Sequence, residues 1–156
     1  MSETAGSRVV ITGIGVVSPF GVGRERFWDH VSRGCSGTRA ITEFDASEFD
    51  SQVAAPVEGI TLEDVPALGG DDIWDEQYRA DPKRYSRAAL VGVIAAREAW
   101  IHAGLRIGEP QAGVIVGSGG GGIDVGERQY SDFFVERGRK VTPYAIPVSI
   151  VGMLSS

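Results

Sequence analysis

The chain has 156 residues, of which 42% are hydrophobic and 23% charged, values typical of globular proteins and unlike those of disordered or membrane-embedded chains. The formal net charge of -6 repels a phosphate backbone, so we expect no nucleic-acid partner. No apolar run reaches the roughly 20 residues of a membrane span, and the single cysteine and the start MSETAGSR, without a secretory signal, predict a cytoplasmic protein with no membrane partner.

The first predicted element is a strand over residues 9–11, where three β-branched residues precede a pair of spaced glycines. Such a run is typical of a strand buried on both faces. Residues 13–18, GIGVVS, are close to the G-x-G-x-x-G pattern in which a helix N-terminus binds a pyrophosphate. Pro19 and two further glycines prevent a helix from starting there. We interpret residues 13–18 as a structural turn, and a small nucleotide-binding domain is the weakest alternative.

A short amphipathic helix is predicted within residues 23–34, GRERFWDHVSRG. Its apolar side chains Phe27, Trp28 and Val31 fall on one side, and Gly34 supplies the stop.

Cys35 is the one thiol that could act as a nucleophile, and His30 is the nearest base. Five helical residues place two side chains about 140° apart around the axis, and Gly34 ends the helix between them. A catalytic thiol needs a base within hydrogen-bond reach. We therefore expect Cys35 to be a small inert residue.

The clearest predicted helix runs from about Pro82 to Leu105. Asp81 is the expected N-cap, Pro82 suits the first turn, and Gly104 can end the helix in a left-handed conformation. Apolar and small residues cover nearly its whole circumference, so this helix is expected to be central.

The second histidine, His102, lies on this helix, where we expect a packing or surface role. Two distant histidines and one cysteine do not give the spacing of a metal site, so we expect no metal and no cofactor.

A second buried strand is predicted over residues 112–117, leading into the glycine loop GSGGGGID at residues 117–124. The loop has the glycine density of a phosphate loop but lacks its lysine, and Asp124 would repel a phosphate. A run of glycines indicates close approach of the backbone to another backbone or to a ligand, and the sequence leaves both open. Residues 123–138 have mixed helical character, and residues 141–154 are apolar.

The order of these elements resembles the N-terminal half of β-ketoacyl-acyl-carrier-protein synthases over nearly the whole chain. The resemblance is carried by the segments RVVITGIGVVSPFGVG, FWDHVSRGCSG, KRYSRAALVGVIAAREAWIHAGL, GVIVGSGGGG and RKVTPYAIPVSIVGM. It implies an α/β, thiolase-like αβαβα layered fold, of which residues 1–156 would form the N-terminal half as an incomplete domain.

In this family a cysteine at a helix N-terminus accepts an acyl group, and two histidines assist decarboxylation of a malonyl thioester whose carbanion attacks that group. The resemblance implies that these residues and a structural lysine lie beyond residue 156, so the isolated chain is expected to lack catalytic residues and activity. The implied partners are an acyl carrier protein, acyl and malonyl thioesters, and a second subunit in a homodimer or heterodimer.

The resemblance also implies roles for particular residues. It places Gly119, Gly120 and Ala145 at the acyl pocket, and Tyr144, Ile146 and Ile150 at the dimer interface. Elongating bacterial synthases commonly hold a bulky aliphatic residue at the position of Gly120 and an aromatic residue at that of Ala145. Both departures remove bulk, so a polyketide or specialised-lipid synthase is at least as well supported as a fatty-acid enzyme. The alternative is a noncatalytic dimerisation or interaction module derived from a ketosynthase.

Overall fold

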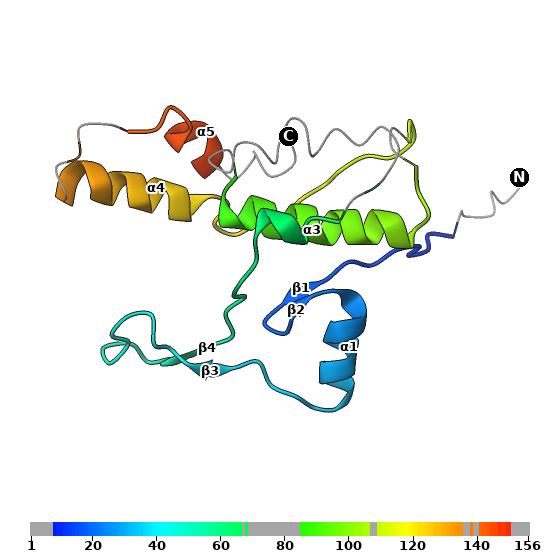
Figure 1. Ribbon diagram of the computed structural model, residues 1–156, viewed down its shortest axis with the longest axis horizontal. Coiled ribbons are helices and arrows are strands. Elements are labelled where there is room, and N and C mark those ends of the chain that lie inside the picture. The colour runs from blue at the N-terminus through cyan, green and yellow to red at the C-terminus, as the bar shows by residue number, and fades with distance from the viewer. Residues whose placement is uncertain are drawn as a thin grey trace, which may run out of the picture.

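The computed structural model describes residues 8–66, 68, 85–106, 109–135, 138 and 141–150. One long helix, α3, runs through the middle of the molecule, with a strand hairpin and α1 against one side and α4 and α5 near its start (Figure 1). The elements in chain order are β1 (Val17–Ser18), β2 (Gly21–Val22), α1 (Arg24–Ser32), β3 (Arg39–Ala40), β4 (Val53–Ala54), the 3-10 turn η1 (Leu62–Asp64), α3 (Arg87–His102), α4 (Ile123–Tyr130), the π-helical segment η3 (Ser131–Val135) and α5 (Ala145–Ser149).

The strands form two short antiparallel pairs. β1 pairs with β2, with Val17 opposite Val22, and β3 pairs with β4, with Arg39 opposite Ala54. Gly21 adopts a φ of 109°, which only glycine enters readily, so the β1–β2 turn depends on a residue without a side chain.

The helix predicted within residues 23–34 is confirmed as α1, and Gly34 follows it with a φ of 71°. None of its residues is buried, and Trp28 is 68% exposed. The described residues therefore cover the apolar side of the helix only in part, since Phe27 is partly buried while Trp28 and Val31 are exposed.

The long helix is confirmed, but its predicted start is wrong. α3 begins at Arg87, because Ser86 is the N-cap and its hydroxyl accepts a hydrogen bond from the Ala89 N–H at 3.1 Å. The caps expected from the sequence, Asp81 and Pro82, lie outside the described residues. The predicted end is correct, since Gly104 follows the helix with a φ of 67°.

The main apolar core lies on the first half of α3. Ile94 is fully buried there against Val65, and partly buried side chains from β1, β2, η1 and α3 surround the pair. The expectation that this helix is central is borne out on that face, while Ile101 near its end is 48% exposed.

The two predicted buried strands are not formed. Residues 9–11 and 112–117 carry no strand, and Val9 and Ile115 are 97% and 99% exposed. A buried strand requires hydrogen-bonding neighbours and cover on both faces. No described residue pairs with either segment. Their β-branched composition alone was therefore not enough to form a strand.

Helical character after the second glycine loop is confirmed. α4 starts directly after Gly122, passes into η3, and packs against α5. Val125 of α4 and Val148 of α5 are buried at this contact.

Candidate functional site

The glycines of the first turn lie directly on the backbone of α3. A Cβ atom on Gly15 would overlap the Ala95 carbonyl oxygen, and one on Gly13 would overlap the Ala99 carbonyl oxygen and lie 2.8 Å from the nitrogen of Ala103. Neither glycine has a positive φ. These two positions are therefore fixed by close approach of two backbones rather than by backbone conformation.

Two polar side chains of α3 bind the free amides of this turn. The Glu98 carboxylate accepts hydrogen bonds from the Val16 N–H at 2.8 Å and the Arg24 N–H at 2.9 Å, and the Arg24 guanidinium lies 3.7 Å away. His102 Nδ1 accepts from the Ile14 N–H at 3.1 Å. These amides are occupied by α3 rather than offered to a pyrophosphate, which supports the interpretation of residues 13–18 as a structural turn.

Sequence reasoning missed Glu98. Its signal was a carboxylate within a helix that is otherwise apolar and small nearly all round. Helix α1 begins at Arg24, and its N-cap residue, Gly23, has no side chain that could accept a hydrogen bond from the first amides of the helix. The Glu98 carboxylate accepts the hydrogen bond from the Arg24 N–H instead. His102 has the structural role that its position predicted.

The structure gives Cys35 no partner base among the described residues. The His30 ring stacks on Phe20 with centroids 4.5 Å apart, and its Nδ1 lies 2.8 Å from the Arg26 carbonyl oxygen. Cys35 is exposed, and no hydrogen bond joins its thiol to His30.

The second glycine loop meets α5. A Cβ atom on Gly122 would overlap the Val148 carbonyl oxygen, and Gly121, whose φ is 53°, donates its N–H to the Ser118 hydroxyl at 2.9 Å. Of the two readings left open by the sequence, close approach to another backbone is thus confirmed at Gly122.

The two loop residues expected at an acyl pocket are in open space. No described atom lies within 4 Å of a Cβ built on Gly119, and one on Gly120 would meet only the Ile123 methyl at 3.4 Å, an ordinary van der Waals contact. Both glycines are exposed and neither has a positive φ, so the loop can carry side chains there.

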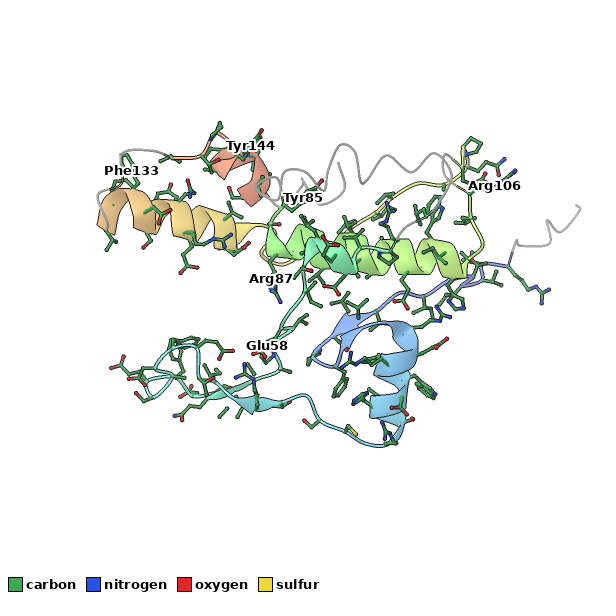
Figure 2. All side chains as sticks on the ribbon, viewed as in Figure 1. Glu58, Tyr85, Arg87, Arg106, Phe133 and Tyr144 are labelled. Carbon is green, nitrogen blue, oxygen red and sulfur yellow. The ribbon has the colours of Figure 1, made fainter. Side chains whose placement is uncertain are left out.

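Ala145 lies at an apolar cavity of about 310 Å³ between α4, η3 and α5. Figure 2 shows Phe133 toward the far end of the α4–η3 helix and Tyr144 where α5 begins. The cavity lining consists of Gly126, Gln129, Tyr130, Phe133, Phe134, Val141, Ala145, Ile146 and Ser149. Gly119 and Gly120 are not among these residues, so the structure does not bring all three expected pocket positions to one cavity.

The residues expected at a dimer interface lie in α5 and at its two ends. Ile146 and Ile150 are 70% and 53% exposed, whereas Tyr144 is half-buried and donates its N–H to the Thr142 hydroxyl at 3.4 Å. An exposed apolar surface is what a subunit contact would require.

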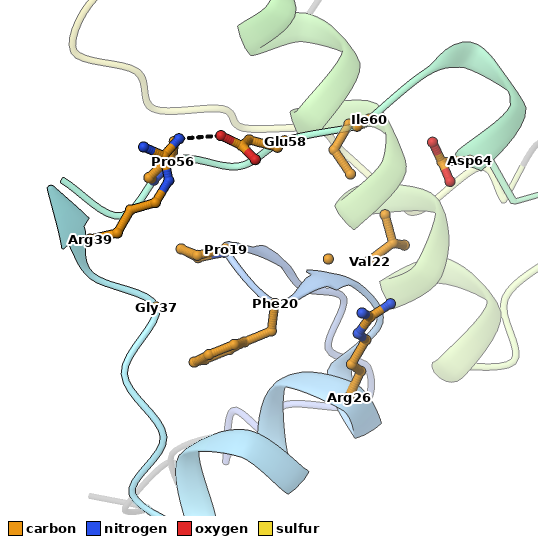
Figure 3. A pocket seen from close by; sticks show the side chains of 12 residues that line it. Pro19, Phe20, Val22, Arg26, Gly37, Arg39, Pro56, Glu58, Ile60 and Asp64 are labelled. Atoms are coloured by element: carbon orange, nitrogen blue, oxygen red, sulfur yellow. Dashed lines mark hydrogen bonds and ion pairs between the residues drawn. The ribbon is translucent and has the colours of Figure 1, made fainter. Parts of the chain in front are cut away.

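A larger and more polar cavity, of about 560 Å³, opens beside the β1–β2 turn. Figure 3 shows Phe20 and Arg26 on one side of it and the ion pair of Arg39 with Glu58 on the other. No group of three histidine, cysteine, aspartate or glutamate residues in the described part of the chain could hold a metal ion. Among the described helices, none combines the length and apolar content needed to cross a bilayer.

The described residues combine helices with two short strand pairs, and similar solved structures identify the fold as α/β. One similar structure is the ishigamide ketosynthase/chain length factor, with a TM-score of 0.68 and 25% identity over 93% of this chain and 34% of that chain. A second is a β-ketoacyl synthase from Burkholderia phymatum STM815, with a TM-score of 0.64 and 23% identity over 94% of this chain and 34% of that chain. The fold is that of the ketosynthases.

The sequence assigns the family. The model of the β-ketoacyl synthase N-terminal domain matches residues 6–156, and the chain belongs to this family. The 3-oxoacyl-[acyl-carrier-protein] synthase 2 of Coxiella burnetii (strain RSA 493 / Nine Mile phase I) is 38% identical over 151 residues, 95% of this chain and 34% of that protein. The chloroplastic 3-oxoacyl-[acyl-carrier-protein] synthase I of Hordeum vulgare is 34% identical over 96% of this chain and 32% of that protein. The chain spans about a third of the length of these relatives.

Proposed function

We propose that this chain is the N-terminal portion of a β-ketoacyl-acyl-carrier-protein synthase that performs decarboxylative Claisen condensation in fatty-acid or polyketide biosynthesis. The observation that carries the proposal is the family match over residues 6–156, almost the whole chain. In the proposed enzyme these residues form the N-terminal part of a thiolase-like layered domain located in the cytoplasm.

The proposed reaction joins an acyl group to a malonyl unit held on an acyl carrier protein. A cysteine thiolate outside this chain displaces the carrier thiol from an acyl thioester and becomes acylated. The malonyl thioester then loses carbon dioxide, and its carbanion attacks the acyl-enzyme carbonyl, which releases the thiolate and leaves a β-ketoacyl thioester. In this scheme no residue of the present chain forms a covalent bond to substrate.

The contribution of the chain is proposed to be scaffold, acyl pocket and subunit contact. Gly119, Gly120 and Ala145 line the acyl pocket, and Tyr144, Ile146 and Ile150 contact a second subunit. The open space over Gly119 and Gly120 supports the first part, and the exposure of Ile146 and Ile150 supports the second. Missing bulk at Gly120 and Ala145 favours long or bulky acyl primers.

The test measures covalent acylation by a radiolabelled acyl thioester. The isolated 156-residue chain is expected to take up no label above the rate of a free thiol, whereas the chain joined to its C-terminal portion becomes labelled and forms β-ketoacyl product. Cys35→Ala is the matched variant in both forms and should change neither result. Rapid labelling of the isolated chain that Cys35→Ala abolishes would overturn the assignment of the nucleophile to another part of the protein.

The second candidate, a noncatalytic dimerisation or interaction module, is favoured by the apolar surface around α4 and α5. Sedimentation separates the two proposals. A partial domain that lacks its neighbours should associate and bind a hydrophobic dye, because side chains such as Phe134 and Ile146 are 68% and 70% exposed. A compact species of fixed size that binds no dye would support the stand-alone module.

A further inference from the structure

The loop between β3 and β4, residues 43–50, projects from the edge of the molecule away from α3 (Figure 1). Two backbone amides close it into a defined shape. The Phe49 N–H donates to the Ala46 carbonyl oxygen at 3.0 Å, and the Ser47 N–H donates to Asp45 Oδ1 at 3.0 Å. Ala46 is buried within the loop. The loop is thus a folded surface rather than an open chain.

Two aromatic rings stand side by side on this surface. Phe44 and Phe49 are 57% and 60% exposed, and their ring centroids lie 5.9 Å apart at an interplanar angle of 76°. Paired exposed rings on one ordered loop have the geometry of interface anchors, since they bury a large area at little conformational cost.

The loop is also strongly acidic. Residues 43–50 contain four carboxylates and no lysine or arginine. Only Glu43 is paired, with Arg39 at 2.5 Å, and this hydrogen bond lowers the pKa of Glu43 to about 2. The carboxylates of Asp45, Glu48 and Asp50 form no ion pair with any described residue. Three negative charges around the rings are therefore uncompensated.

We propose that the loop 43–50 is a docking surface for a basic protein segment, whose arginine or lysine side chains lie over the two phenylalanine rings and pair with the neighbouring carboxylates. Aromatic faces and carboxylates share an attraction for cations, and here both are on one surface. The same charge repels nucleic acid, an anionic membrane and the identical loop of a second copy.

The experiment uses the full protein and a fluorescent peptide of four alternating arginine and leucine pairs, with the glutamate–leucine peptide as its counterpart. Anisotropy at low ionic strength is expected to show binding of the basic peptide alone, and hydrogen exchange should show new protection confined to residues 43–50. Phe44→Ala with Phe49→Ala should weaken binding about tenfold or more. Glu48→Gln with Asp50→Asn should weaken it less and reduce its dependence on salt.

Matched controls are Trp28→Ala and Glu25→Gln, an exposed ring and an exposed carboxylate on α1. Both should leave peptide affinity unchanged, and urea unfolding midpoints confirm that every variant is folded. The proposal is overturned if the double phenylalanine variant binds as well as the wild type or if both peptides bind equally. It is also overturned if hydrogen exchange shows the loop already protected in the peptide-free full protein, because the rest of the protein would then be its occupant.

Discussion

The two glycine turns are similar in sequence but differ in which of their glycines contact the backbone of another element. In the turn at residues 13–16 both glycines lie against the α3 backbone, and the intervening amides are bound by Glu98 and His102. In the loop at residues 117–122 only Gly122 meets another backbone, that of Val148. The first turn is filled at every glycine, whereas the second has open space over Gly119 and Gly120.

This difference separates two uses of glycine. Where a Cβ atom would overlap a backbone atom, glycine is required for folding. Where the space beside it is empty, packing of the described residues does not explain the missing side chain. The comparison therefore assigns the first turn to packing, and in the second it leaves room over Gly119 and Gly120 for the proposed pocket.

The largest expected effect is from Gly15→Ala. The added methyl overlaps the Ala95 carbonyl oxygen, so the turn must move off α3, and we expect a loss of about 3 kcal/mol in the free energy of unfolding. Urea denaturation of the full protein measures this loss. Gly119→Ala is the control and should change stability by less than about 0.5 kcal/mol. Similar losses for the two variants would contradict the distinction between the turns.

Gly120→Ile tests the open space as an acyl pocket. If the gap admits about four extra carbons, each adds roughly 0.8 kcal/mol, so filling it should reduce turnover of long primers by about two orders of magnitude relative to acetyl or butyryl primers. Rates across a primer series in the complete enzyme measure the change, with Gly120→Ala as a graded control. An unchanged chain-length profile would show that Gly120 does not line the pocket.

Glu98→Gln weakens the hydrogen bonds that α3 makes to the Val16 and Arg24 amides while keeping a side chain of the same shape. It replaces a charged acceptor of two backbone N–H groups, so we expect a loss of about 2 kcal/mol in unfolding free energy. Glu25→Gln, on the exposed surface of α1, is the matched control and should be neutral. Equal unfolding midpoints in urea for both variants would show that the Glu98 hydrogen bonds do not stabilise the turn.

The smallest effect is expected from His102→Ala. This side chain is exposed and water can replace the acceptor that it offers to the Ile14 N–H, so the loss should be about 0.5 kcal/mol. Hydrogen exchange at the Ile14 amide is the sharper measurement and should accelerate, while exchange at the Val16 amide stays slow. Acceleration at both amides would mean that the turn moves as one body.

The helices could be predicted from the sequence because their signals are local. Apolar spacing predicted α1, and apolar and small residues on nearly every side predicted α3, whereas residues 123–138 showed only mixed helical character. Gly34 and Gly104 were expected to end the first two helices, and both have the left-handed conformation. The start of α3 was misplaced because two capping signals, Asp81 and Ser86, occur within a few residues of each other, and local pattern does not rank them. Strands at residues 9–11 and 112–117 depend on neighbours far along the chain, which local composition does not supply.

The site was less accessible to sequence reasoning than the fold. The interpretation of residues 13–18 as a structural turn followed from Pro19 and the two glycines after it, but the partners of the Ile14 and Val16 amides are more than 80 residues away along the chain. Gly120 and Ala145 entered only through family resemblance. The structure adds that Ala145 lies at an apolar cavity, and their shared pocket is a prediction for the complete enzyme.

Because α3 contacts the first turn through main-chain atoms, the turn should show an alternating tolerance to mutation. Positions 14 and 16 offer only their amides to His102 and Glu98, so most side chains can be exchanged there without changing what α3 binds. Positions 13 and 15 accept nothing larger than hydrogen. A library that randomises these four residues should therefore return variants with a period of two, a pattern that imitates a strand exposed on one face although no strand is formed.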